Sequence, residues 1–153
     1  MLSIPVRFTL RSGYGEAETP LNAFDVALLA AGMGDLNLLK VSTILPPGAV
    51  YTEELDIAPG SLVPTAYATL SSQMPGTRIT AAVAVGLPAD AGCGVIMACS
   101  GHCSREEIEE RITAMVEEAF AMRQRPLREI RIAAVEHVVE KCGSVFAGVA
   151  LWY

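Results

Sequence analysis

Proline and glycine interrupt this sequence so often that the chain is restricted to short elements. Turns are marked by Pro-Pro-Gly at 46–48 and by Pro-Gly at 59–60 and 75–76.

No stretch approaches the roughly 18 apolar residues of a membrane span. The first residues, which include Arg7 and Arg11, lack the apolar core of a signal peptide. We therefore expect a cytoplasmic protein without membrane spans.

Alternating apolar and polar residues predict several strands. From Ile4 to Leu10 every second residue is apolar, which is the period of a strand with one buried face. Further strands are predicted near residues 36–44, 62–70, 79–87, 94–100, 130–139 and 145–152. The chain is thus expected to contain about seven strands.

Two helices are predicted from their caps. Thr19-Pro20 has the N-cap and first-turn residues of a helix that ends at Gly32 or Gly34. Ser104 with Glu107 is a capping box ahead of a second apolar stripe at helical spacing. Because each helix can cover one face of a sheet, the pattern favours a layered α+β sandwich.

The composition favours one dense domain. Of the 153 residues, 52% are hydrophobic and 18% are charged, so the chain can bury a large core. We expect residues 1–153 to form a single domain. The net charge of -6, without a cluster of Lys or Arg, disfavours nucleic acid and anionic lipid as partners and allows a small cationic ligand.

The four cysteines raise the alternative of a metal site. Cys99, His102 and Cys103 lie close in sequence, but three residues separate the two cysteines, unlike the usual zinc spacings. Buried thiols in a reducing compartment explain them better, so no metal is expected.

Asp25 is an unusual residue within the first predicted helix. It shares a face with Leu21, Leu28 and Leu29 at spacings of three and four residues, so we expect it away from the solvated side. A carboxylate between apolar walls could hold an ammonium or guanidinium group. The alternative is a partly exposed aspartate at the edge of the apolar stripe.

Ser42 and Thr43 place two hydroxyls at the end of an apolar run, directly before the Pro46-Pro47 turn. Such pairs usually satisfy backbone groups or begin a turn. The same residues could form a self-cleaving bond, in which the Thr43 hydroxyl attacks the Ser42 carbonyl and gives an ester. The residues alone leave both interpretations open.

Motifs over nearly the whole chain resemble one family. They are GEAETPLNAFDVALLAAGMGDLNLLKVSTILPPGA, SLVPTAYATL, PGTRITAAVAVGLP, CGVIMACSGHCSREEIEE and AVEHVVEKCGSVFAGVALWY, in this order. They are similar to the pyruvoyl-dependent arginine decarboxylases. The resemblance implies a four-layer αββα sandwich and a homotrimer or dimer of trimers with active sites between subunits. Members of that family cut themselves before a serine, which becomes a pyruvoyl group.

The resemblance also assigns roles to individual residues. The cut would fall between Ser42 and Thr43, leaving a β chain of 1–42 and an α chain of 43–153. The new keto group would form a Schiff base with arginine, which loses CO2 to give agmatine for polyamine biosynthesis. Asp25 matches the acidic substrate-binding residue of the family, and Asn37 matches an active-site amide.

Two departures from the family pattern bear on activity. Thr43 stands where the family has serine, so the product would be a 2-oxobutanoyl rather than a pyruvoyl group. Ala98 stands in the position of the catalytic glutamate, and Ser100 replaces a second glutamate on the same strand face, with Cys99 opposite.

The alternative function is an unprocessed, impaired homologue that serves as a binding or regulatory subunit of a trimer, together with an active paralogue. Strands containing Leu70, Ala81 and Ala147 are expected to supply apolar surface for the trimer.

Overall fold

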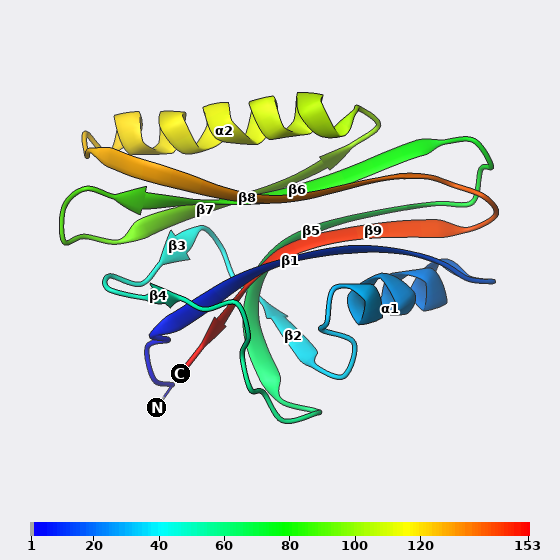
Figure 1. Cartoon of the computed structure of the whole chain (residues 1–153), viewed down its shortest axis with the longest axis horizontal. Helices are drawn as coiled ribbons and strands as arrows, with labels where there is room; N and C mark the ends of the chain where they lie inside the picture. Colours follow the sequence, from blue (N-terminus) through cyan, green and yellow to red (C-terminus); the bar gives the residue numbers. More distant parts are fainter. Residues whose placement is uncertain (1) are drawn as a thin grey trace.

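A computed structural model describes residues 2–153 and shows two stacked sheets between two helices (Figure 1). The helices are α1 (Pro20–Ala30) and α2 (Arg105–Met122). The strands are β1 (Arg7–Glu16), β2 (Asn37–Lys40), β3 (Ile44–Leu45), β4 (Val50–Tyr51), β5 (Leu62–Ser72), β6 (Arg78–Pro88), β7 (Gly94–Gly101), β8 (Leu127–Val138) and β9 (Gly143–Trp152).

The sheets have the strand orders β2-β5-β9-β1-β4 and β3-β7-β6-β8. Helix α1 covers the outer face of the five-stranded sheet, and α2 covers the outer face of the four-stranded sheet (Figure 1). This order of layers confirms the predicted αββα sandwich. The pairings are antiparallel except for β1 with β4 and β2 with β5, which are parallel.

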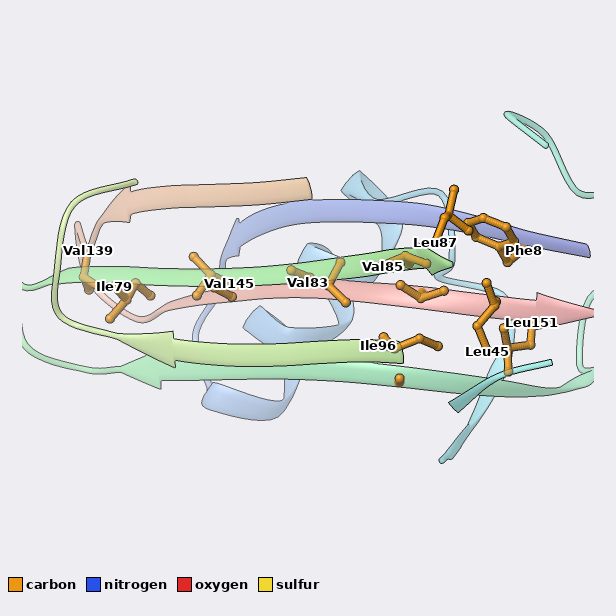
Figure 2. Packing of buried hydrophobic residues seen from close by; sticks show 14 residues of the cluster. Phe8, Leu45, Ile79, Val83, Val85, Leu87, Ile96, Val139, Val145 and Leu151 are labelled. Carbon is orange, nitrogen blue, oxygen red and sulfur yellow. The ribbon is translucent and has the colours of Figure 1, made fainter. Parts of the chain in front are cut away.

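The main core lies between the two sheets. Figure 2 shows side chains of β6, such as Val83 and Val85, near Val145 and Leu151 of β9. Ala81 and Ala147 are fully buried in this same layer. The expectation that their strands supply apolar surface for a trimer is therefore wrong, because these two residues already pack within one chain.

The predicted helix caps are confirmed. The Thr19 hydroxyl accepts a hydrogen bond from the Asn22 backbone N–H at 3.2 Å, and Pro20 follows as the first helical residue. Helix α1 stops at Ala30, and Gly32 then adopts a φ of +76°, which glycine tolerates without steric cost. Ser104 accepts from the Glu107 backbone N–H in the same manner at 3.1 Å.

Two strand predictions need correction. The first strand begins at Arg7 rather than at Ile4 and continues to Glu16, beyond the alternating segment. The single strand predicted over residues 36–44 is instead two short strands in different sheets. Residues 41–43 cross from one sheet to the other. The unbroken apolar run concealed this break, because Val41 is directed to one sheet and Ile44 pairs with the other.

Candidate active site

The crossing segment forms one wall of a cavity of about 220 Å³. Strand β5 contributes Ala66 and Tyr67, and β7 contributes the residues from Ile96 to Ala98. Ser42, Thr43 and Ala98, which sequence analysis singled out separately, line this same cavity together with Lys40, Val41 and Met97. The structure thus brings Ser42, Thr43 and Ala98 to one cavity.

Hydrogen bonds fix the backbone on both sides of the Ser42–Thr43 bond. The Val41 N–H donates to the Thr65 carbonyl at 3.1 Å, which ties the chain to the five-stranded sheet. The Ile96 N–H donates to the Thr43 carbonyl at 2.7 Å, which ties it to the four-stranded sheet. The peptide bond between these two anchors is therefore held at both ends by different sheets.

The Ser42 carbonyl differs from its neighbours. Among residues 2–153, no backbone or side-chain donor forms a hydrogen bond with its oxygen. The Ser42 and Thr43 hydroxyls also make no hydrogen bond within this part of the chain. Ser42 is exposed and Thr43 is half-buried. The carbonyl that would be attacked and the hydroxyl that would attack are thus both free of competing partners.

Ala98 lies on β7 opposite Val83 of β6. Its methyl group packs against the core between the sheets, whereas Cys99 contacts the cluster beneath α2. This confirms that the two neighbours point to opposite faces of the strand. Burial raises the pKa of the Cys99 thiol, which keeps it protonated and unreactive at neutral pH. Among residues 2–153, no carboxylate lines the cavity.

Sequence reasoning missed Lys40, which also lines the cavity. It is the last residue of β2, and its ammonium lies 4.8 Å from the centre of the Tyr67 ring. Of the described residues that line the cavity, Lys40 is the only one with a formal charge. The sequence could have indicated Lys40, because it stands two residues before Ser42 and alternate residues of an extended chain point to the same side.

The structure does not bring Asp25 and Asn37 into this cavity. Asp25 is exposed on α1, on a face where Leu21 is 74% and Leu29 is 54% accessible. The expectation that Asp25 lies away from the solvated side is wrong for one chain, because α1 buries Ala23 and Ala27 instead. Asn37 is exposed and donates from Nδ2 to the Gly60 carbonyl at 3.0 Å.

The residues considered for a metal site have other contacts. His102 Nδ1 lies 3.0 Å from the Arg78 carbonyl oxygen, and Cys103 packs beside the cluster beneath α2. Within residues 2–153, no three His, Cys, Asp or Glu side chains are grouped as metal ligands.

Neither of the two helices in the described range is long and apolar enough to cross a membrane.

The geometry defines a class of protein: an αββα sandwich with a Ser-Thr bond held between its sheets, beside a cavity. A pyruvoyl-dependent histidine decarboxylase structure determined at pH 8 shares this fold, with a TM-score of 0.53. It is 17% identical and covers 63% of this chain, while the match covers 52% of that chain. At this identity the likeness shows the fold alone.

A sequence model of the pyruvoyl-dependent arginine decarboxylase family matches residues 7–153. A protein of that name from Methanocaldococcus jannaschii is 46% identical over 151 residues, which are 98% of this chain and 92% of the relative. Another from Pyrococcus abyssi is 38% identical, over 97% of this chain and 96% of the relative. The chain belongs to the pyruvoyl-dependent arginine decarboxylase family, as its motifs predicted.

Proposed function

We propose that this protein is a carboxy-lyase that converts arginine into agmatine and CO2, using a keto group made from its own residue 43. One observation carries the proposal: Ser42, Thr43 and Ala98, which correspond to the cleavage site and acid position of the family, line one cavity. The relatives are named arginine decarboxylases, which supports arginine as the substrate. The four free thiols support a reducing, cytoplasmic location.

Residue 43 fits a self-generated keto group. Its Oγ adds to the Ser42 carbonyl carbon, its proton moves to the amide nitrogen, and the C–N bond breaks to leave an ester and an amine. Water then removes the Cα proton, the Cβ–Oγ bond breaks, and Ser42 leaves as a carboxylate. Water hydrolyses the resulting enamine, by way of its imine, to a ketone and ammonia. From Thr43 this ketone is a 2-oxobutanoyl group, and from serine it is a pyruvoyl group.

The cleaved protein would consist of chains 1–42 and 43–153. The keto group supplies an electron sink for the loss of CO2. The contribution of the chain itself is to hold this group at the cavity, through the hydrogen bond between Ile96 and Thr43. The same bond keeps the new end of the chain attached to β7 after cleavage.

We place the guanidinium-binding residue in a neighbouring subunit. Asp25 is exposed and lies outside the cavity of its own chain, on a helix whose Leu21 and Leu29 are also exposed. Packing of this face against a second copy would bury both leucines and place a carboxylate at a shared site. A homotrimer or a dimer of trimers gives each cavity such a neighbour. Asn37 would support the site from β2.

The absence of a carboxylate at position 98 limits the rate. A positioned general acid contributes about 10²- to 10⁴-fold to a reaction rate. Water or a residue from a neighbouring subunit would have to return the proton to the decarboxylated carbon. We therefore expect slow turnover rather than none.

The test is to incubate the purified chain with arginine labelled in its carboxyl carbon and to measure released CO2. Release above that of a Thr43→Val control, which lacks the attacking hydroxyl, supports the proposal. Lysine and ornithine serve as alternative substrates. If the chain stays uncleaved and binds agmatine without any CO2 release, the protein acts instead as a binding subunit.

A further inference from the structure

We propose that Lys40 stabilises the negative charge that forms on the Ser42 carbonyl group during self-cleavage. This inference rests on the proposed processing of the Ser42–Thr43 bond and assigns one further residue to it. The structural basis is that Lys40, Ser42 and Thr43 line one small cavity. In the part of the chain that the structure describes, Lys40 is the only charged side chain that lines it.

The position of Lys40 is determined by the sheet. It pairs with Thr65 in the parallel ladder between β2 and β5, and the chain then leaves the sheet at Val41. The Tyr67 ring, two residues further along β5, lies 4.8 Å from the ammonium. That ring is in turn packed against the buried ring of Phe146, with 5.6 Å between their centres. The ammonium therefore rests on a supported aromatic surface at the cavity.

Lys40 is also available for a new partner. None of the ion pairs among residues 2–153 involves Lys40, although Lys141 pairs with Glu18 and Arg125 pairs with Asp90. Its contact with Tyr67 is at an exposed site, where a cation–π interaction is weak. A flexible four-carbon stem lets the ammonium move from the ring to a nearby anion.

The cleavage reaction makes an anion in this cavity twice. Addition of the residue 43 hydroxyl places negative charge on the Ser42 carbonyl oxygen, and breaking of the Cβ–Oγ bond later releases Ser42 as a carboxylate. Within the described residues that oxygen has no hydrogen-bond donor, so no backbone oxyanion hole is formed there. Charge aimed at the developing anion is the usual way to lower such a barrier. Lys40 is the group in the cavity that can supply it.

The test uses a Thr43→Ser chain, which we expect to cleave, and follows the intact fraction by denaturing mass spectrometry over time. Lys40→Met in this background should slow cleavage by about 10²-fold, as for loss of an oxyanion donor. Lys40→Arg, which keeps the charge, should retain most of the rate. Lys141→Met is the matched control, because its ammonium pairs with Glu18 outside the cavity. It should cleave like its parent.

Two results would overturn the role of Lys40. One is equal cleavage by the Lys40→Met and parent chains. The other is equal slowing by Lys40→Met and Lys40→Arg, which would indicate shape rather than charge. If the Thr43→Ser chain itself stays intact, hydroxylamine is added to open any accumulated ester at Ser42. If the Thr43→Ser chain accumulates this ester and the same chain with Lys40→Met does not, the result supports the inference. Absence of both cleavage and ester in the presence of Lys40 contradicts the processing proposal itself and removes this role with it.

Discussion

The backbone N–H of Ile96 donates a hydrogen bond to the carbonyl oxygen of Thr43 at 2.7 Å, which links the crossing segment to strand β7. This bond fixes the residue that follows the proposed cleavage site, while the hydrogen bond from Val41 to Thr65 fixes the chain before it. Between these bonds, the Ser42 carbonyl lacks a hydrogen-bond donor from residues 2–153. The arrangement holds both ends of one peptide bond and leaves its reactive atoms without hydrogen-bond partners among the described residues.

Restoring the acid at position 98 should increase turnover. We expect the double variant Thr43→Ser and Ala98→Glu to release CO2 from arginine about 10²-fold or more faster than Thr43→Ser alone. The reason is that position 98 lines the same cavity as residues 42 and 43. Labelled CO2 release at equal fractions of cleaved chain measures the effect. Ala121→Glu is the control, because Ala121 is exposed near the end of α2 and does not line the cavity. Equal rates with and without the Ala98→Glu change would show that another group supplies the proton.

Asp25→Asn should weaken binding of agmatine without unfolding the chain. The change removes the carboxylate charge from an exposed helix position and preserves the shape of the side chain. Calorimetry should show at least about a tenfold loss of affinity, the scale of one charge-assisted hydrogen bond. Asp35→Asn, another exposed carboxylate beyond the same helix, is a suitable control. Unchanged affinity for Asp25→Asn would remove Asp25 from the site.

The exposed face of α1 should mediate self-association. Leu21 and Leu29 are largely exposed in one chain, so we expect light scattering at micromolar concentration to give a mass of three or six chains. Replacing both leucines by Glu should shift the protein toward monomer and also abolish agmatine binding, because Asp25 then reaches no neighbouring cavity. A parent that is monomeric at these concentrations contradicts the shared-site proposal.

Glu16 should make stability depend on pH. Burial alone would raise the pKa of its carboxyl group, but hydrogen bonds from the Lys141 N–H, His137 and the Cys142 N–H together hold that pKa below its ordinary value. A lowered pKa gives stability that is present above the ordinary value and is lost as the pH falls through the folded value. Glu16→Gln should therefore lower the free energy of unfolding at pH 7 by about 1–3 kcal/mol.

Urea unfolding at several pH values measures this effect. The difference between the parent and Glu16→Gln should begin to shrink as the pH falls below the ordinary glutamate pKa of about 4.3, and it should disappear only below the lower pKa of the folded state. Glu18→Gln is the control, because its ion pair with Lys141 is exposed and should contribute little. A difference that does not change with pH would mean that Glu16 acts through its shape alone.

The layers of the fold could be predicted because their signals are local. Thr19 and Ser104 cap their helices through residues three positions ahead, and alternation placed Ala98 and Cys99 on opposite faces of one strand. Such patterns are contained in a few consecutive residues. The same reasoning failed for residues 36–44, where the apolar run continues although the chain changes sheets.

The site required contacts between distant residues. The hydrogen-bond partners of Val41 and Thr43 are Thr65 and Ile96, which lie much further along the sequence. Lys40 resembles an ordinary charged residue at a strand end until Tyr67 and the cavity are placed beside it. Asp25 was assigned from helical spacing to a buried face, but spacing alone does not show whether that face meets its own sheet or solvent.

The most direct test of the account is the intact mass of freshly purified Thr43→Ser chain under denaturing conditions, beside the parent and Thr43→Val. The β-methyl group of threonine crowds the attack, so we expect the parent to remain mainly one chain of about the calculated 16.2 kDa. Thr43→Ser should separate into chains 1–42 and 43–153, the second with a pyruvoyl group at its start. Thr43→Val should remain intact. A Thr43→Ser chain that keeps its full mass, without ester that hydroxylamine can open, would contradict the claim that this fold activates the Ser42–Thr43 bond.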